Sequence, residues 1–387
     1  MSLSGIWYLG RRHLRRNRIK SSLLIAALTV VLSLPACLLV LVDEAEDHFR
    51  YRAESTPLVL GAAGSELELA FNALYFSKPG IAPLEAGEVS KLTEDRLAIG
   101  VPLFVRFAAQ GIPIVGTSID YFRQRDLEIA DGRLFVTLGE CVVGAEAARA
   151  LDVEVGGAVI SSPDAIFDLG GVYPLKMKVV GVLSPTGEAD DRAIFADVKT
   201  TWVISGLAHG HQEAEKLAAE ARLETEGEGI ALNASVIEYN EVTPDNIDSF
   251  HFHGDPETFP LTAALVFPTD QKSQTILLGR DRETQLIEPP RVMDELFATI
   301  FQIRDFAVAA LGLSALVSLT VCVLVFLLSN RLRKAEFSSL SQIGASRSFV
   351  RGLMFFEGVF VVAVSLVLML GVAMTAKMSF SWILRLF

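Results

Sequence analysis

Three long apolar segments dominate the pattern of hydrophobic and polar positions along the chain. Residues 23–42 and 306–328 carry no charged side chain, and residues 353–376 carry one, Glu357. A helix rises about 1.5 Å per residue, so each segment is long enough to cross a bilayer core of roughly 30 Å. The pattern therefore predicts three transmembrane helices. The alternative for the first segment is a secretory signal peptide, but acidic residues follow it where a cleavage site would need small ones.

Between the first two spans the pattern alternates between strand and helix, which predicts a mixed α+β domain. Helices are expected over residues 83–95, 146–151 and 270–278. A subdomain is expected at about 130–230, and its polar stretch over 206–230 is either an exposed helix or a flexible insertion. Five runs rich in β-branched residues, each closed by Gly, Ser or Pro, predict strands: TPLVLGAA, IPIVGTS, CVVGA, LKMKVVGVL and AALVFP.

The end of this domain predicts an unusually long helix. After Pro289 and Pro290 no helix breaker occurs before Gly312, which lies inside the second span. The interpretation is one continuous helix of about 40 residues, hence about 60 Å long, from the domain through the membrane. The charged run DEAEDHFRYRAE likewise predicts that the first span continues as a helix for two or three turns.

Charge is distributed unevenly and predicts an orientation. Residues 43–305 contain 21 Lys+Arg and 44 Asp+Glu, so their formal charge is 21 − 44 = −23, whereas residues 1–22 and 329–352 are basic. By the positive-inside rule, the N-terminus and the loop 329–352 are cytoplasmic and the large domain faces outwards. Residues 1–22 form either an amphipathic helix at the inner interface or a basic tail that only sets the topology. The acidic domain argues against a nucleic-acid partner.

Enzyme chemistry is not indicated by any motif. The sequence has no G-x-x-x-x-G-K-[ST] phosphate loop, no G-x-S-x-G elbow and no H-E-x-x-H helix, so we expect neither nucleotide hydrolysis nor another catalytic activity in this chain. Its three cysteines, two of them within spans, offer no disulfide framework. Four histidines form two H-x-H pairs that either bind a metal ion such as zinc or are exposed loop residues: His209, His211, His251 and His253.

Glu357 is the one charged residue within a predicted span. A carboxylate in the membrane is costly and normally faces protein or water. We expect it to lie near the cytoplasmic surface and to pair with an arginine such as Arg351 or Arg347. A direct role in ion transport is the less favoured alternative, because the spans contain no second charge.

The loop after the second span reads RLRKAEFSSLSQIGASRSFVRGLMFFEG, and it resembles the corresponding loop of FtsX-like permeases of the MacB and lipoprotein-releasing type of ABC transporter. Three stretches of the large domain also look like family segments: GIPIVGTSIDYFRQRDLEIADGRLF, VVGAEAARALDVEVGG and VVGVLSPTGEADDRAIF. The resemblance covers nearly the whole chain.

The resemblance implies an α-helical membrane protein with a periplasmic α+β domain, made of a porter-like part and an inserted, mostly-β subdomain. A separate cytoplasmic ATPase would hold ATP and Mg²⁺, and this chain would bind no cofactor. The permease would transmit movement outwards by mechanotransmission, and a short helix in the loop would dock on the ATPase. The residues implied in that coupling are Arg331, Arg333, Glu336, Phe337, Leu340, Ile343, Gly344, Ala345, Ser346 and Arg347. The alternative is that the basic residues set the topology and the small ones only make a turn.

The expected function is that of a permease subunit in the bacterial inner membrane, paired with a second copy or a related permease. It would serve export or extraction of a hydrophobic, peptide or lipoprotein-like cargo, with a possible periplasmic adaptor as a further partner. The alternatives are a non-transport relay that regulates an extracytoplasmic enzyme or sensor, and a metal-linked system. The family has a fourth span; residues 377–387 are too short to be one, and we expect them at the outer interface, as a three-span variant or a truncation.

Overall fold

The computed structural model describes residues 3–16, 18–77, 80–94, 96–162, 174–210, 222–223, 231–232, 240–280, 283–334, 338–339, 342 and 344–384. Two compact units make up the chain. One is formed by Met1–His48 and Leu296–Leu384, and the other by Phe49–Glu295. They are a bundle of long helices and an α/β domain.

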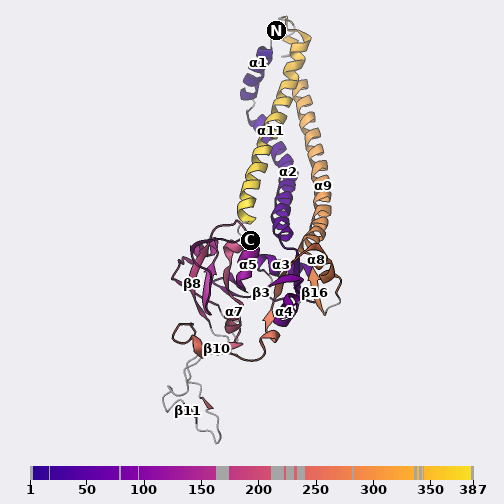
Figure 1. Cartoon of the computed structure of the whole chain (residues 1–387). Helices are drawn as coiled ribbons and strands as arrows, with labels where there is room; N and C mark the ends of the chain where they lie inside the picture. Colours follow the sequence, from indigo (N-terminus) through magenta and orange to yellow (C-terminus); the bar gives the residue numbers. More distant parts are fainter. Residues whose placement is uncertain are drawn as a thin grey trace. The chain divides into compact units, whose positions relative to one another are not determined.

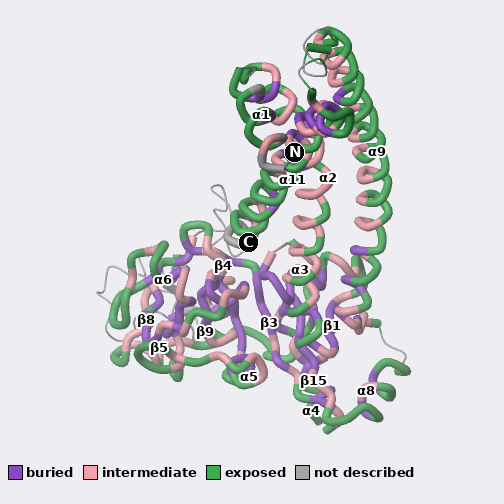
Figure 2. Tube along the Cα trace, turned by 90° about the horizontal axis from the view of Figure 1, so that it is seen from above, coloured by how far each residue is buried: buried purple, intermediate pink, exposed green. Residues whose placement is uncertain are grey.

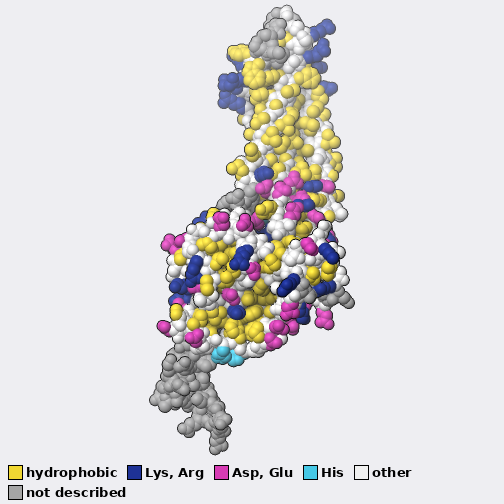
Figure 3. All heavy atoms as spheres, viewed as in Figure 1, with side chains coloured by type: hydrophobic (Ala, Val, Ile, Leu, Met, Phe, Trp, Pro, Cys, Tyr) yellow, Lys and Arg dark blue, Asp and Glu magenta, His cyan; other side chains and the backbone are white. Residues whose placement is uncertain are grey.

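Four helices with defined bounds in the described part of the chain belong to the first unit or continue into it. They are α1 (Leu3–Arg16), α2 (Arg18–Glu54), α9 (Pro289–Leu332) and α11 (Arg347–Leu384), and Figure 1 shows each as one uninterrupted coil. The last three are long and apolar enough to cross a membrane. Apolar side chains cover these helices, with Lys and Arg gathered near one end and Asp and Glu near the other (Figure 3). The three predicted spans are thus confirmed as long apolar helices.

The 44-residue helix α9 is continuous from Pro289 to Leu332, as the sequence predicts, and is about 66 Å long. Proline is well suited to its first turn, because the first backbone N–H groups of a helix have no partner within it. The continuation of α2 to Glu54 is also confirmed. In contrast to the expected separate segment over 377–387, α11 continues to Leu384, since no Gly or Pro interrupts the sequence after Gly371.

The α/β domain is built on a ten-stranded sheet with the order β16-β1-β15-β3-β4-β9-β6-β8-β5, and β7 pairs with β8. Neighbouring strands are antiparallel except for the pairs β4–β9 and β6–β8. The strands are β1 (Leu58–Ala62), β3 (Ala98–Ala109), β4 (Ile112–Thr117), β5 (Ile129–Gly132), β6 (Glu140–Val143), β7 (Ala158–Ile160), β8 (Lys176–Leu183), β9 (Ile194–Asp197), β15 (Ala263–Pro268) and β16 (Thr284–Ile287).

Short strand pairs and helices complete the domain. The pairs are β2 (Leu84–Glu85) with β14 (Pro260–Leu261), β10 (Ala208–Gly210) with β13 (Phe250–Phe252), and β11 (Arg222–Leu223) with β12 (Ala231–Leu232). The α-helices are α3 (Glu66–Tyr75), α4 (Ala86–Glu94), α5 (Ile119–Gln124), α6 (Ala145–Leu151), α7 (Val198–Ile204) and α8 (Gln271–Leu278), and the 3₁₀ turns are η1 (Ala189–Arg192), η4 (Ile247–Ser249) and η5 (Pro256–Thr258).

Local sequence explains the sharp connections in the domain. The strands β3 and β4 are joined by Gln110 and Gly111, both with positive φ, which is the geometry of a two-residue type I′ hairpin turn. The carboxylate of Asp270 accepts a hydrogen bond from the Ser273 backbone N–H at 2.7 Å and caps α8, as the sequence predicts. These turns place the apolar faces of the strands in one core.

The core of the domain lies along the central strands. Figure 2 shows β1, β3, β4 and β15 mostly buried, whereas α9 is exposed or half-buried along most of its length. The large side chains that are fully buried include Leu58, Leu60, Phe104, Ile114, Tyr121, Met177, Leu183 and Phe195. The long helices therefore do not derive their apolar character from burial within this chain, which fits a membrane protein with a large extramembrane domain.

All five predicted strands and all three predicted helices of the domain are confirmed, as β1, β4, β6, β8 and β15 and as α4, α6 and α8. The strands between residues 129 and 197 continue the same sheet at one end. The expected subdomain boundary at about 130–230 stays a prediction, because most of residues 206–230 lie outside the described part of the chain.

Candidate functional site: the segment between two apolar helices

The segment between α9 and α11 ends in a tight turn with defined geometry. Gly344 has a φ of +93°, in the left-handed region that glycine adopts without a steric penalty. The hydroxyl of Ser346 accepts a hydrogen bond from the Phe349 backbone N–H at 3.3 Å and so caps the first turn of α11. The predicted turn over 344–346 is confirmed, and glycine and serine each have a separate reason to be there.

The predicted coupling residues flank this turn. Arg331 is exposed in the last turn of α9, and Arg347 is exposed at the start of α11. Arg333 and Ala345 are half-buried. Four predicted residues lie outside the part of the chain that the structure describes: Glu336, Phe337, Leu340 and Ile343. The described residues 338, 339 and 342 have helical backbone. A short helix between α9 and α11 stays a prediction.

Glu357 belongs to a partly buried polar cluster that joins three helices. Its Oε1 lies 3.1 Å from the Nζ of Lys20 on α2, and the same ammonium donates a hydrogen bond to the Ser329 hydroxyl of α9 at 2.8 Å. The Glu357 side chain is 6% exposed and that of Lys20 29%. The Lys20 ammonium also lies 5.3 Å from the centre of the Phe326 ring, at cation–π distance.

The expected pairing of Glu357 with Arg351 or Arg347 is wrong. On one helix, residues three or four apart are neighbours, but Arg351 is six positions before Glu357 and Arg347 is ten. At about 100° per residue, six positions place the side chains of Arg351 and Glu357 on different sides of the helix. The counter-charge therefore comes from Lys20, which lies 337 positions away in the sequence.

The N-terminal helix α1 is packed against α11 rather than being only a basic tail. The Trp7 ring meets Phe356 edge-on at 5.6 Å between centroids, and Phe360 at 6.4 Å. A Cβ atom at Gly10 would lie 2.2 Å from the Phe356 ring, so the close approach of the two helices requires glycine at this position. The arginines at 11, 12, 15 and 16 are exposed, as expected for the polar side of an amphipathic helix.

Two of the four histidines can be placed as side chains. His251 and His253 lie on and just after β13, with ring centroids 4.7 Å apart. The backbone of His209 on β10 is paired in register with His251, and His211 lies outside the described residues. Among the described residues, no group of three or more His, Cys, Asp and Glu side chains is placed to hold a metal ion.

A buried charge network inside the domain was not predicted. Arg52, in the last turn of α2, donates hydrogen bonds to both carboxylate oxygens of Asp190, at 2.5 and 3.2 Å. The Tyr121 hydroxyl donates to Asp190 Oδ1 at 2.5 Å, and Arg52 Nε donates to the Leu74 carbonyl. No local signal distinguishes Arg52 from Arg50, which is half-exposed and pairs with Asp294 at 2.8 Å.

Comparison with known proteins finds solved structures that resemble the chain, and two of them are described below. No protein-family model matches the chain, and no curated protein matches it. The periplasmic region of MacB from Actinobacillus actinomycetemcomitans is similar over 63% of this chain and 94% of its own length, with 11% identity and a TM-score of 0.36. The extracellular domain of YknZ, a noncanonic ABC-type transporter from Gram-positive bacteria, is similar over 59% and 98%, with 12% identity and a TM-score of 0.32.

Proposed function

We propose that this chain is the permease subunit of an ABC transporter and that a separate cytoplasmic ATPase docks on the segment between α9 and α11. The observation that carries the proposal is the geometry of that segment. It joins two long apolar helices, its last turn is fixed by Gly344 and Ser346, and arginines at 331 and 347 flank it. The chain's own sequence lacks a phosphate loop, so the energy of ATP would have to come from a partner.

The long helix α9 gives the proposed coupling a physical route. Its 44 residues are helical without a break from Pro289, next to the domain, to Leu332, next to the docking segment. A displacement imposed at Leu332 would therefore pass along a continuous helix rather than through a flexible joint. The Lys20–Glu357 pair and its hydrogen bond to Ser329 would make α2 and α11 follow α9, because separating them would leave charges unpaired in an apolar environment.

The orientation and partners follow from charge. Basic residues flank the docking segment and precede the first span, and the domain is acidic, which supports a cytoplasmic N-terminus and an extracytoplasmic domain in a bacterial inner membrane. A second permease, either another copy or a related chain, would complete the transporter. The cargo class that we propose, a hydrophobic, peptide or lipoprotein-like molecule for export or extraction, rests on the family resemblance.

Binding of the ATPase can be tested by co-purification. The full-length chain would be expressed with the ATPase encoded beside its gene, and the amount of ATPase retained per permease would be measured. The substitution Gly344→Val places a β-branched residue at positive φ, which costs more than 1 kcal/mol, and should reduce retention at least fivefold. Gly371→Val is the matched control, because both glycines have open space where a Cβ would lie and Gly371 sits within α11. Equal retention by the two variants would contradict docking at this turn.

A further inference from the structure

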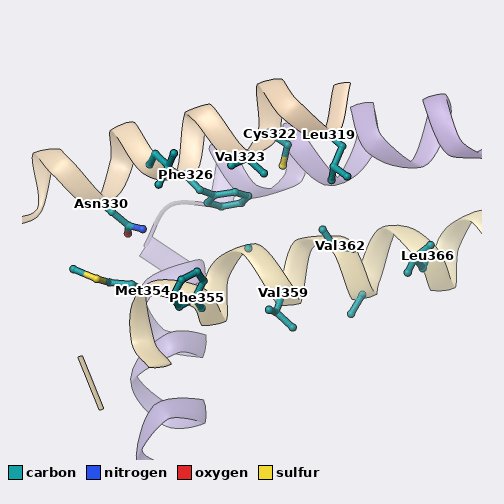
Figure 4. A pocket seen from close by; sticks show the side chains of 13 residues that line it. Leu319, Cys322, Val323, Phe326, Asn330, Met354, Phe355, Val359, Val362 and Leu366 are labelled. Carbon is teal, nitrogen blue, oxygen red and sulfur yellow. The ribbon is translucent and has the colours of Figure 1, made fainter. Parts of the chain in front are cut away.

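An apolar groove runs between α9 and α11 in the helical unit. It has a volume of about 450 Å³ and is lined by side chains from both helices, among them Val323 and Phe326 of α9 and Val359 and Val362 of α11 (Figure 4). Its lining is almost entirely apolar, and Val359 is 66% exposed. The groove is therefore open to the surroundings of the helices and is not a closed cavity in their core.

The groove continues into a second cavity with a cationic rim. This cavity, of about 530 Å³, shares Leu327, Asn330, Met354 and Phe355 with the first, and adds Arg331 and Lys334. Both cations are exposed. Within the described part of the chain, neither of them makes an ion pair or hydrogen bond. The apolar groove thus ends at two available positive charges, which follow the apolar segment 306–328 in the sequence.

The dimensions of the groove match one leaflet of a bilayer. Its lining residues on α9 extend from Leu319 to Asn330, which is about 16 Å along the axis, and those on α11 extend from Met354 to Leu366, about 18 Å. Half of a bilayer core is roughly 15 Å thick. An acyl chain lying in the groove would therefore reach from mid-membrane to the polar boundary, where the two cations stand.

We propose that this groove binds one anionic phospholipid of the surrounding membrane, with an acyl chain between α9 and α11 and the phosphate at Arg331 and Lys334. Charge complementarity selects an anionic headgroup, because each Lys or Arg near a membrane surface favours anionic lipid. The family resemblance implies that Arg331 contacts the ATPase, whereas its position on the rim of the second cavity implies that its guanidinium binds the lipid phosphate. The lipid would thus lie next to the docking segment. The inference uses the proposed function only in taking these helices as membrane spans.

The test is native mass spectrometry of the full-length chain, purified in detergent, delipidated and titrated with phosphatidylglycerol or phosphatidylcholine. The wild type should bind one phosphatidylglycerol with at least tenfold preference over phosphatidylcholine. The double variant R331Q/K334Q should lower the preference to threefold or less, and R331K/K334R should retain it. The variant R347Q/R351Q removes two exposed arginines that do not line the groove, and it should keep the wild-type preference.

The apolar half of the site has its own pair of variants. Val359→Trp fills the groove and should weaken both lipids at least fivefold, whereas Val367→Trp changes an equally exposed valine of α11 outside it and should have no effect. Equal binding of the two lipids by the wild type would overturn the proposal, as would an equal loss in R331Q/K334Q and R347Q/R351Q. A dimer that excludes lipid and dissociates on Val359→Trp would assign the groove to a second copy. None of these lipid-binding measurements requires the ATPase. A negative result would therefore contradict the lipid site without contradicting the proposed function.

Discussion

Arg52 and Asp190 form a bidentate ion pair in the interior of the α/β domain, with both side chains 2% exposed. Burial alone would raise the pKa of Asp190, but the charge and hydrogen bonds of Arg52, together with Arg125 and the Tyr121 hydroxyl, lower that pKa below its usual value. The pair fixes the last turn of the 37-residue helix α2 to the η1 turn of the domain. The end of the first apolar helix is therefore held by charge as well as by packing.

Removing one partner of this pair should destabilise the protein strongly. We expect Arg52→Met to lower the free energy of unfolding by about 3–5 kcal/mol, because it leaves the Asp190 carboxylate buried without its counter-charge. The double variant Arg52→Met/Asp190→Leu should recover part of the loss. Denaturant unfolding of the full-length protein, followed by the near-ultraviolet signal of the domain, measures both. Arg50→Met is the control, since its partner Asp294 is exposed, and a loss as large as that of Arg52→Met would contradict the assignment.

Loss of Lys20 should be more damaging than loss of Glu357. The Glu357 side chain is 6% exposed and that of Lys20 29%, so Lys20→Met removes the counter-charge of the more deeply buried group, whereas Glu357→Gln leaves an ammonium closer to the surface. The expected cost of Lys20→Met is about 2–4 kcal/mol in detergent-induced unfolding.

The control for this pair is Lys377→Met, which breaks a bridge between an exposed Lys377 and a half-buried Glu44 and should cost less than about 1 kcal/mol. Equal effects of Lys20→Met and Lys377→Met would show that burial of the Lys20–Glu357 pair contributes nothing.

Acid should remove one identifiable contribution to the stability of the domain. The Arg133 guanidinium, with two backbone N–H groups, lowers the pKa of Glu140 to about 2. Because this folded-state pKa lies below the unfolded value, the stabilisation is complete above pH of about 4.5 and is lost as the pH falls towards 2. Arg133 is 54% exposed, so solvent screening limits the contribution to roughly 1–2 kcal/mol.

The variant Glu140→Gln isolates that contribution. The difference in unfolding free energy between wild type and Glu140→Gln should shrink between pH 4.5 and pH 2. Asp120→Asn, which loses an exposed contact to Arg123, serves as the control and should show a small difference at every pH. A gap for Glu140→Gln that widens with acid would contradict the pKa shift.

The contact between α1 and α11 can be tested through its glycine. A Cβ atom at Gly10 would meet the Phe356 ring at 2.2 Å, so Gly10→Ala should separate the helices or displace the ring and cost about 1–3 kcal/mol. At Gly5 the nearest atom would lie 3.4 Å away, which is ordinary contact, and Gly5→Ala should be neutral or slightly stabilising because alanine favours a helix. The change in tryptophan fluorescence relative to the wild type reports the separation, because Trp7 contacts the Phe356 ring; an unchanged spectrum and unchanged stability in Gly10→Ala would refute it.

Local patterns in the sequence predicted much of the fold. Apolar runs, proline positions and capping residues are local signals, so the long helices, the α8 cap and the turn at Gly344 could be found from neighbouring residues alone. The 12-residue strand β3 was not among the predicted strands; it contains Pro102, and proline lacks the N–H group that a strand pairing on both sides uses. The Pro102 carbonyl accepts a hydrogen bond from Thr117 Oγ1.

The charge pairs could not be predicted because their partners are distant in the sequence. Lys20 and Glu357 are 337 positions apart, and Arg52 and Asp190 are 138 apart. Which charges meet depends on how helices and strands pack, and neither periodicity nor spacing encodes that. Arg351 and Arg347 are near Glu357 in the sequence, but helical geometry places neither of them next to it.

Coupling through the segment between α9 and α11 is tested most directly by the ATP turnover, in nanodiscs, of the ATPase that we propose as the partner. Turnover would be measured for the ATPase alone and with the wild-type, Gly344→Val or Gly371→Val form of this chain. We expect the wild type and Gly371→Val to change the turnover severalfold and Gly344→Val to leave it at the rate of the ATPase alone. A rate that is the same with and without the wild-type permease, or one that Gly344→Val alters as much as the wild type does, would contradict coupling through the segment between α9 and α11.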